Sequence, residues 1–357
     1  MLELVYAEGY QLERFDTGER WLRQADAWLQ RVGEGGQLVV RRHLSEGLMR
    51  REQGRLREAV EALGRARAAV DELPAGEQAQ NARLSVTAAL AVTLRVQGEV
   101  DAALATHAEA IALAEALYGP EHPSYATELN NAGAARLQHG DVAGSEGLLR
   151  RALEIRAASF GPAHPSVLEG RINLAIVMLQ LGRQDEAVAL LEAAERHAEG
   201  AEARIRVELL VMLGGVRLEQ GRFEAADATL RRALAEAHAA WPADDPRALQ
   251  VLANLSNLAN RRERWAEAEQ LAREGLRTVE GSSREAMGMV EGYLQLNLGD
   301  ALAEQGRRAE AVPAYAAALT KMEANLGPEH SHLHAPLLGL GQCLVRTGEA
   351  ARAEPLL

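Results

Sequence analysis

The sequence predicts an all-α protein made of repeated helical hairpins. Three observations support this prediction: a turn residue that recurs at a nearly constant interval, small side chains at fixed distances from that turn, and helically spaced apolar residues on both sides of it. No stretch alternates apolar and polar residues in the way that a β-strand does. We call the helix before each turn helix A and the helix after it helix B.

The recurring turn residue sets the repeat length. It is glycine at every position but one, where Glu263 replaces it, and the intervals are 44, 42, 42, 39, 42, 43 and 42 residues. A period in this range is typical of a solenoid, in which one repeat cannot bury its apolar face alone. The turn residues are Gly54, Gly98, Gly140, Gly182, Gly221, Glu263, Gly306 and Gly348.

Small residues stand at fixed distances from each turn. We expect helices A and B to cross closely at these positions, because a larger side chain would overpack the crossing at a cost of about 1–3 kcal/mol. Seven positions before the turn they are Gly47, Ala91, Gly133, Ala175, Gly214, Ser256, Gly299 and Gly341. Five positions after it they are Ala59, Ala103, Ser145, Ala187, Ala226, Ala268, Ala311 and Ala353.

A second motif separates consecutive hairpins. It reads GPEHPS at 119–124, GPAHPS at 161–166, WPADDP at 241–246 and GPEHS at 327–331. Gly-Pro is expected to end helix B, and His-Pro-Ser to start the next helix A with its serine in the first turn.

Together these motifs resemble the tetratricopeptide repeat (TPR), in the 42-residue variety of kinesin light chains and many bacterial regulatory proteins. The resemblance covers roughly residues 40–357. It implies a right-handed α-solenoid superhelix of about eight TPR helical hairpins. We expect an N-terminal helical cap at 1–39 and a TPR array at 40–357. The expected repeats are 40–80, 81–122, 123–164, 165–203, 204–245, 246–288, 289–330 and an incomplete 331–357.

The two ends of the array depart from the pattern. The first repeat has Glu46 where leucine is usual, and Arg50 four residues later predicts an ion pair on one helix face. The last repeat stops one turn short of a complete helix B, so we expect the chain to be a fragment of a longer protein.

Composition excludes several classes of function. The net charge of −12 argues against nucleic acid and anionic membranes as partners. The single cysteine, Cys343, rules out a disulfide framework, and no signal peptide or long apolar run is present, so we expect a cytoplasmic protein. Lys321 is the only lysine among 39 basic residues, which we interpret as the GC bias of a bacterial genome.

Asparagines on helix A are the first candidate site. Asn131, Asn173, Asn254 and Asn297 all stand nine residues before a turn, and Asn130 and Asn257 lie beside this row. An amide both donates and accepts, so such a row can hold the backbone of an extended peptide. The TPR resemblance implies the same use of this position. The alternative is that these amides bond to the neighbouring helix.

Charged residues on the same face form the second candidate site. By repeat register Arg41, Arg51 and Arg95 face the groove and would select an acidic ligand segment. Acidic residues face inward further along the chain: Glu169, Glu208, Asp300 and Glu304. The alternative is a solvated surface with chance clustering. No lysine stands where the carboxylate clamp of chaperone-binding TPR proteins requires one.

Neither metal binding nor catalysis is indicated. His330, His332 and His334 form an H-x-H-x-H string, but at a loop-to-helix junction this spacing converges poorly, and packing within the loop is the simpler interpretation. We expect no cofactor. No nucleophile, metalloprotease or phosphate-loop motif is present, so we predict that the chain is not an enzyme.

The function predicted from sequence is a protein–protein interaction scaffold. Its helix A groove would hold a peptide or a partner's helix. The main alternative is the sensor or regulatory arm of a larger bacterial signalling protein, such as a Ser/Thr kinase or a nucleotide-switch ATPase. Self-association through the incomplete last repeat is a third alternative.

Overall fold

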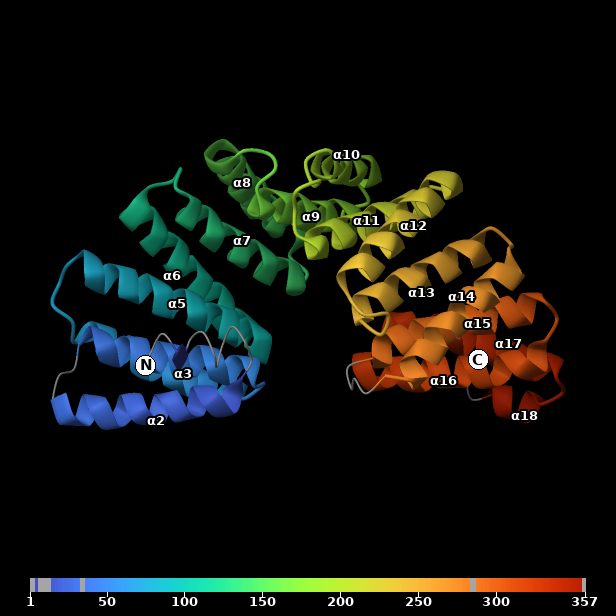
Figure 1. Ribbon diagram of the computed structural model, residues 1–357, viewed down its shortest axis with the longest axis horizontal. Helices are drawn as coiled ribbons and strands as arrows, with labels where there is room; N and C mark the ends of the chain where they lie inside the picture. Colours follow the sequence, from blue (N-terminus) through green and yellow to red (C-terminus); the bar gives the residue numbers. More distant parts are fainter. Residues whose placement is uncertain (1–3, 6–13, 33–35, 283–286, 355–357) are drawn as a thin grey trace. The chain divides into compact units, whose positions relative to one another are not determined.

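The structure is a computed structural model that describes residues 4–5, 14–32, 36–282 and 287–354 (Figure 1). In these ranges the ordered elements are helices, and no strand occurs. The chain divides into two compact units, Met1–Arg183 and Gln184–Leu357, and each is described by itself.

Unit 1 contains the first eight labelled helices. They are α2 (Phe15–Val32), α3 (Gln37–Glu52), α4 (Leu56–Asp71), α5 (Glu77–Gln97), α6 (Val100–Tyr118), α7 (Pro123–Gln138), α8 (Val142–Phe160) and α9 (Pro165–Gln180). Helix α2 precedes three hairpins, α3–α4, α5–α6 and α7–α8, and α9 is the next helix A.

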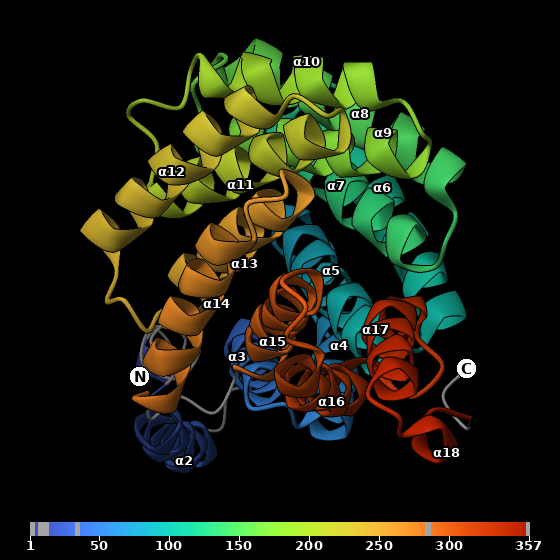
Figure 2. The ribbon, with the colours of Figure 1, turned by 90° about the vertical axis from the view of Figure 1, so that its right-hand side faces the viewer.

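Unit 2 contains the remaining helices. They are α10 (Gln184–Glu195), α11 (Ala203–Glu219), α12 (Phe223–Ala240), α13 (Pro246–Arg261), α14 (Trp265–Glu280), α15 (Gly288–Glu304), α16 (Arg308–Leu326), η2 (Ser331–Leu333), α17 (His334–Arg346) and α18 (Ala350–Ala353). After α10 the hairpins are α11–α12, α13–α14, α15–α16 and α17–α18. Figure 2 shows α13 to α17 following one another in this unit.

In each unit the A helices form one continuous layer. Helix α3 packs on α5, α5 on α7 and α7 on α9; α11 packs on α13, α13 on α15 and α15 on α17. Within the ranges above, the backbones of consecutive B helices do not approach each other closely, and these helices meet through long side chains, as in the ion pairs Arg67–Glu109 and Arg231–Glu267. The A helices therefore lie on the inner side of the stacking in each unit, as a TPR solenoid requires.

The predicted turns are confirmed. All eight turn residues have positive φ, from 59° at Glu263 to 90° at Gly348. Glycine adopts this left-handed conformation without a side-chain clash, whereas another residue pays about 1–2 kcal/mol. Glu263 is the one non-glycine residue with positive φ in the described chain.

The small residues seven positions before each turn have a more specific role than a close helix crossing. In four hairpins a Cβ on this glycine would lie 2.6–2.9 Å from side-chain carbons of the residue nine positions after the turn. The pairs are Gly47 with Leu63, Gly133 with Leu149, Gly214 with Leu230 and Gly299 with Tyr315. Each of these four glycines thus makes room for a large side chain of helix B.

The loop histidines act as helix caps. His122 and His164 each accept a hydrogen bond through Nδ1 from the backbone N–H two residues later, at 3.1 and 3.2 Å. The rings stack on the last aromatic residue of the preceding helix, with centroids 4.8 Å apart for Tyr118 and 4.4 Å for Phe160. The histidine, rather than the serine of His-Pro-Ser, is therefore the N-cap.

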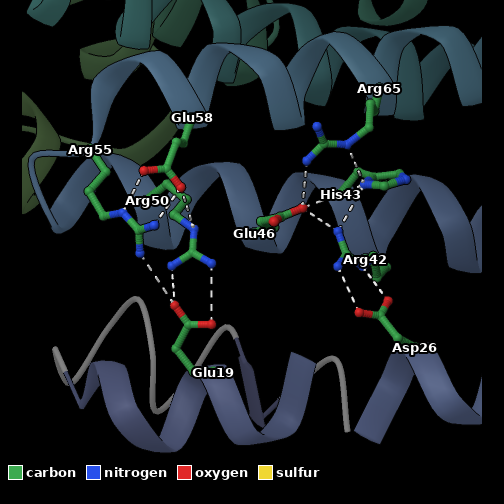
Figure 3. A network of polar contacts seen from close by, with 9 residues as sticks. All are labelled: Glu19, Asp26, Arg42, His43, Glu46, Arg50, Arg55, Glu58 and Arg65. Carbon is green, nitrogen blue, oxygen red and sulfur yellow. Dashed lines mark hydrogen bonds and ion pairs between the residues drawn. The ribbon is translucent and has the colours of Figure 1, made fainter. Parts of the chain in front are cut away.

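Ion pairs hold α2 against the first hairpin (Figure 3). Arg42 of α3 makes a bidentate contact with Asp26 of α2, at 2.6 and 2.8 Å. Arg50 of α3 contacts Glu19 of α2 in the same way. Apolar contacts of Leu22 on Met49 add to this interface. The expected cap therefore contacts the array through both ion pairs and apolar side chains.

The predicted ion pair between Glu46 and Arg50 is replaced by other partners. Glu46 pairs with Arg42 on its own helix and with Arg65 of α4, at 3.0 Å for the latter, while Arg50 turns to Glu19 and Glu58. Burial acts to raise the pKa of Glu46, but the hydrogen bond to His43 and the positive charge of Arg42 outweigh it and lower the pKa to about 2. Apart from Arg42, the partners come from α2 and α4, which local spacing on one helix does not reveal.

Candidate functional site

The candidate site is the layer of A helices. Asn130 and Asn131 lie on α7 and Asn173 on α9, all in unit 1. In unit 2, Asn254 and Asn257 lie on α13. These five side chains are half-buried, which leaves part of each accessible to a ligand.

Two asparagines of unit 1 contact each other. The Asn173 Nδ2 donates to Asn130 Oδ1 across 3.4 Å, so the amides of neighbouring A helices meet on this face. Beside them, Glu128 of α7 is only 7% exposed. Burial raises the pKa of Glu128 to about 7, and the Asn131 side chain acts against this effect. Glu128 was not among the residues predicted from sequence, although its register position is apolar in most other repeats.

Asn297 of α15 differs from the other members of the row. It is buried, and its Nδ2 donates to the Ala253 carbonyl of α13 at 2.8 Å. Asn260 of α13, which sequence analysis did not single out, donates in return to the Asn297 carbonyl at 2.9 Å. At Asn297 the amide thus bonds to the neighbouring helix, which is the alternative that the sequence left open.

The structure brings together two of the three candidate arginines. Arg51 of α3 and Arg95 of α5 both lie three residues before a turn, on helices that pack together. Burial, and then the charge of Arg51, lowers the pKa of Arg95. Arg41 is exposed and ten residues earlier on α3, about 15 Å along the helix axis from Arg51.

The four acidic candidates have different surroundings. In unit 2 the Asp300 carboxylate accepts a hydrogen bond from the buried Tyr315 hydroxyl at 2.7 Å. Glu208 pairs with Arg204 at 3.5 Å, and Glu304 is exposed. Glu169 of unit 1 is half-buried. Burial raises the pKa of Asp300, and the charge of Glu304, four residues later on α15, acts in the same direction.

An apolar cavity of about 450 Å³ opens on the A helices of unit 2. Helices α11, α13 and α15 supply its apolar wall: Val207, Val211, Met212, Pro246 and Val290. Polar and charged side chains border it: Arg204, Glu208, Arg247 and Gln250. The Arg247 guanidinium is held by Asp245 at 2.8 Å and lies over the Trp241 ring at 3.8 Å, so this part of the border is fixed.

The histidine string has a local role. His330 accepts a hydrogen bond from the His332 backbone N–H at 3.2 Å, and His332 Nδ1 lies 2.8 Å from the Tyr293 hydroxyl. The described parts of the chain contain no group of His, Cys, Asp or Glu side chains arranged to hold a metal ion. They also contain no helix long and apolar enough to cross a membrane.

Family profiles described as tetratricopeptide repeat match residues 83–156, 129–200, 211–283 and 294–332, which is more than half of the chain. The chain belongs to the tetratricopeptide repeat family. It is an all-α TPR solenoid, and this fold is a protein-binding one. No curated protein matches the sequence.

Solved structures share the fold of this TPR protein. The apo form of the quorum sensor NprR from B. thuringiensis is similar at 14% identity and a TM-score of 0.66, over 99% of this chain and 95% of that one. NprR in complex with its cognate peptide NprX is similar at 14% identity and 0.54, over 99% and 96%. A putative kinesin light chain with TPR-like repeats from Podosopora anserina is similar at 22% identity and 0.51, over 57% and 98%.

Proposed function

We propose that this TPR protein binds a peptide segment of a partner protein on its layer of A helices, and that a bulky apolar side chain of the ligand fills the cavity of unit 2. The cavity is the observation that carries the proposal. Three consecutive A helices line it, and its wall is apolar although it opens to solvent. Burying a ligand side chain there removes apolar surface from water, at about 25 cal/mol per Å².

The surroundings of the cavity suit a peptide backbone. Gln250 at its border and Asn254, one turn later on α13, offer amides that both donate and accept. A peptide that places its side chain in the cavity can therefore pair its backbone with this helix. That NprR, with the same fold, forms a complex with its cognate peptide NprX supports a peptide as the ligand.

The test selects peptides from a random library on the intact protein and measures their affinity by fluorescence anisotropy. We expect selected sequences to share one bulky apolar residue. Val211→Asp places a charge in the cavity wall and is expected to lower affinity at least about tenfold.

Leu338→Asp is the matched control for this test. Both residues stand ten positions before their turn on an A helix of unit 2, but Leu338 is 53% exposed and does not line the cavity. Affinity in this control is expected to stay within about twofold of the wild type. Selected peptides that bind Val211→Asp and wild type equally would contradict the proposal.

A further inference from the structure

Three A helices begin at an exposed histidine that accepts a hydrogen bond from the backbone. His122 caps α7 and His164 caps α9, and before α17 His330 accepts in the same way from the His332 backbone N–H at 3.2 Å. The Nδ1 atom accepts only when it carries no proton, so each neutral ring holds its proton on Nε2. Each of these caps therefore depends on the protonation state of one side chain.

Helix α13 begins with the same kind of cap but with a different acceptor. Asp245 precedes Pro246 as His122 precedes Pro123, and its Oδ1 accepts from the Arg247 backbone N–H at 3.0 Å. A carboxylate keeps such an acceptor down to about pH 4, whereas a histidine ring gains its second proton between about pH 5 and pH 8. The array thus contains an acid-labile and an acid-stable form of one cap.

A proton on Nδ1 weakens such a cap in two ways. It removes the acceptor of the backbone N–H, and it places a positive charge at the helix N-terminus, where the helix dipole disfavours it. At His164 the Ser166 hydroxyl, 2.8 Å from Nδ1, can turn to accept from the protonated ring. The Ser166 backbone N–H, which lies 3.2 Å from Nδ1, loses its acceptor all the same.

The charged groups beside the rings of unit 1 do not supply a replacement acceptor. Near His164, Arg156 of α8 and Arg171 of α9 donate to backbone carbonyls at 3.4 and 3.1 Å, and a guanidinium group has no acceptor to offer. In the loop between α6 and α7, Glu121 is held by Arg151 of α8. The backbone N–H that each histidine caps is therefore left to water when the ring is protonated.

The start of α17 adds a second histidine. The ring centroids of His330 and His332 lie 4.9 Å apart, and His332 Nδ1 lies 2.8 Å from the Tyr293 hydroxyl of α15. Protonation of both rings brings two positive charges together, and these repel each other. Glu329, the acidic residue next to His330, is exposed to solvent, which screens its charge. Acid is therefore expected to weaken this helix start as well.

We propose that the starts of α7, α9 and α17 form an acid-responsive device, in which protonation of the capping histidines releases the first turns of these helices while α13 stays capped. Helices α7 and α9 carry Asn130, Asn131 and Asn173, so acidification loosens this part of the candidate site in unit 1. The three helices that form the cavity of unit 2 begin at other residues: Glu202, Asp245 and Met287. The device goes beyond the proposed peptide binding and does not depend on it.

The test measures hydrogen–deuterium exchange of the intact protein by mass spectrometry at pH 7.5 and pH 5.5, with exchange times scaled for the intrinsic effect of pH. We expect the first two turns of α9 to lose protection at least about threefold at the lower pH, as the loss of one cap predicts. The first two turns of α13 should keep their protection. Equal losses in α9 and α13, or no loss in α9, would overturn the proposal.

Helix α9 decides the test because α7 contains a second group that responds to pH. Burial raises the pKa of Glu128 to about 7, well above its usual range. The native protein therefore binds this proton before the unfolded chain does, and protonation of Glu128 stabilises α7 as the pH falls. The two effects oppose each other in α7, so its loss of protection is expected to be smaller than that of α9.

His164→Asp gives α9 the acceptor that α13 has, so the pH response of α9 should fall to that of α13. His197→Asp is the matched control, because His197 is exposed after the end of α10 and the charge changes equally. This control should keep the wild-type response of α9. A folded His164→Asp protein that also keeps the full response would contradict the proposal. The comparison of α9 with α13 in the wild type needs no variant, so it decides the question even if His164→Asp does not fold.

Discussion

The hairpins α5–α6 and α15–α16 place a polar side chain at the same buried position, nine residues after the turn, with opposite outcomes. Tyr315 lies on Gly299, and its hydroxyl donates to Asp300 at 2.7 Å. His107 stands in the hairpin of Ala91 and has no partner for either nitrogen. The repeat thus accepts a polar group in its core when the opposite helix supplies both space and an acceptor. Where it supplies no hydrogen-bond partner, the unsatisfied polar group lowers the stability of the fold.

The largest change in stability is expected for His107→Leu. Removing an unsatisfied buried polar group should stabilise the protein by about 1–3 kcal/mol at pH 7.5. The native pKa of about 4 lies below the unfolded value of 6.5, so the unfolded state binds the proton first and the wild type loses stability as pH falls. The advantage of the variant should therefore grow by about 2 kcal/mol between pH 7.5 and pH 5.

Urea unfolding of both proteins at the two pH values measures this advantage. Leu149→His, which places histidine in the same position of α7–α8, should show the reverse effect. An advantage of His107→Leu that does not change with pH would show that His107 does not remain neutral in the native protein.

The second test is Gly299→Ala. A Cβ there would lie 2.8 Å from two ring carbons of Tyr315, and the rigid ring has little freedom to move away. We expect overpacking of about 1–3 kcal/mol to exceed the gain of about 1 kcal/mol that alanine brings to a helix. The control Gly147→Ala, at an exposed site of α8 with nothing within 4 Å, should instead raise the melting temperature. Equal effects of the two changes would show that Tyr315 does not need the space above Gly299.

The smallest effect is expected for Tyr315→Phe. It keeps the packing over Gly299 and removes the donor to Asp300, at a cost of about 1 kcal/mol. Thermal unfolding measures the loss, and Tyr125→Phe on α7 serves as a control on a half-buried tyrosine. A Tyr315→Phe variant as stable as the wild type would mean that satisfying the hydroxyl matters less than filling the space.

Features that recur in every repeat could be predicted from sequence. All eight turn residues adopt positive φ, including Glu263. In the described residues, the segments before and after each of these turns are helices, as predicted. These predictions succeed because the same physical requirement is repeated along the chain, so one exceptional residue does not hide it.

Features that depend on one particular neighbour could not be predicted. Asn297 and Asn254 share a register position, but only Asn297 is buried, because its amide meets the Ala253 carbonyl. Arg50 pairs with Glu19, which lies 31 residues earlier and outside the repeat pattern. The cavity of unit 2 depends on side chains from three helices at different register positions. Arrangements of this kind can be identified only from the three-dimensional structure.

The continuous layer of A helices has a mechanical consequence. Consecutive A helices pack backbone to backbone, whereas consecutive B helices are joined by flexible ion pairs such as Arg67–Glu109, so the A layer is expected to be the stiffer side when a unit bends. Flexing opens or closes the gaps between B helices while the spacing between A helices changes little. Side chains on the A helices would then keep their mutual distances during such motion, and the elastic strain would fall on the opposite edge.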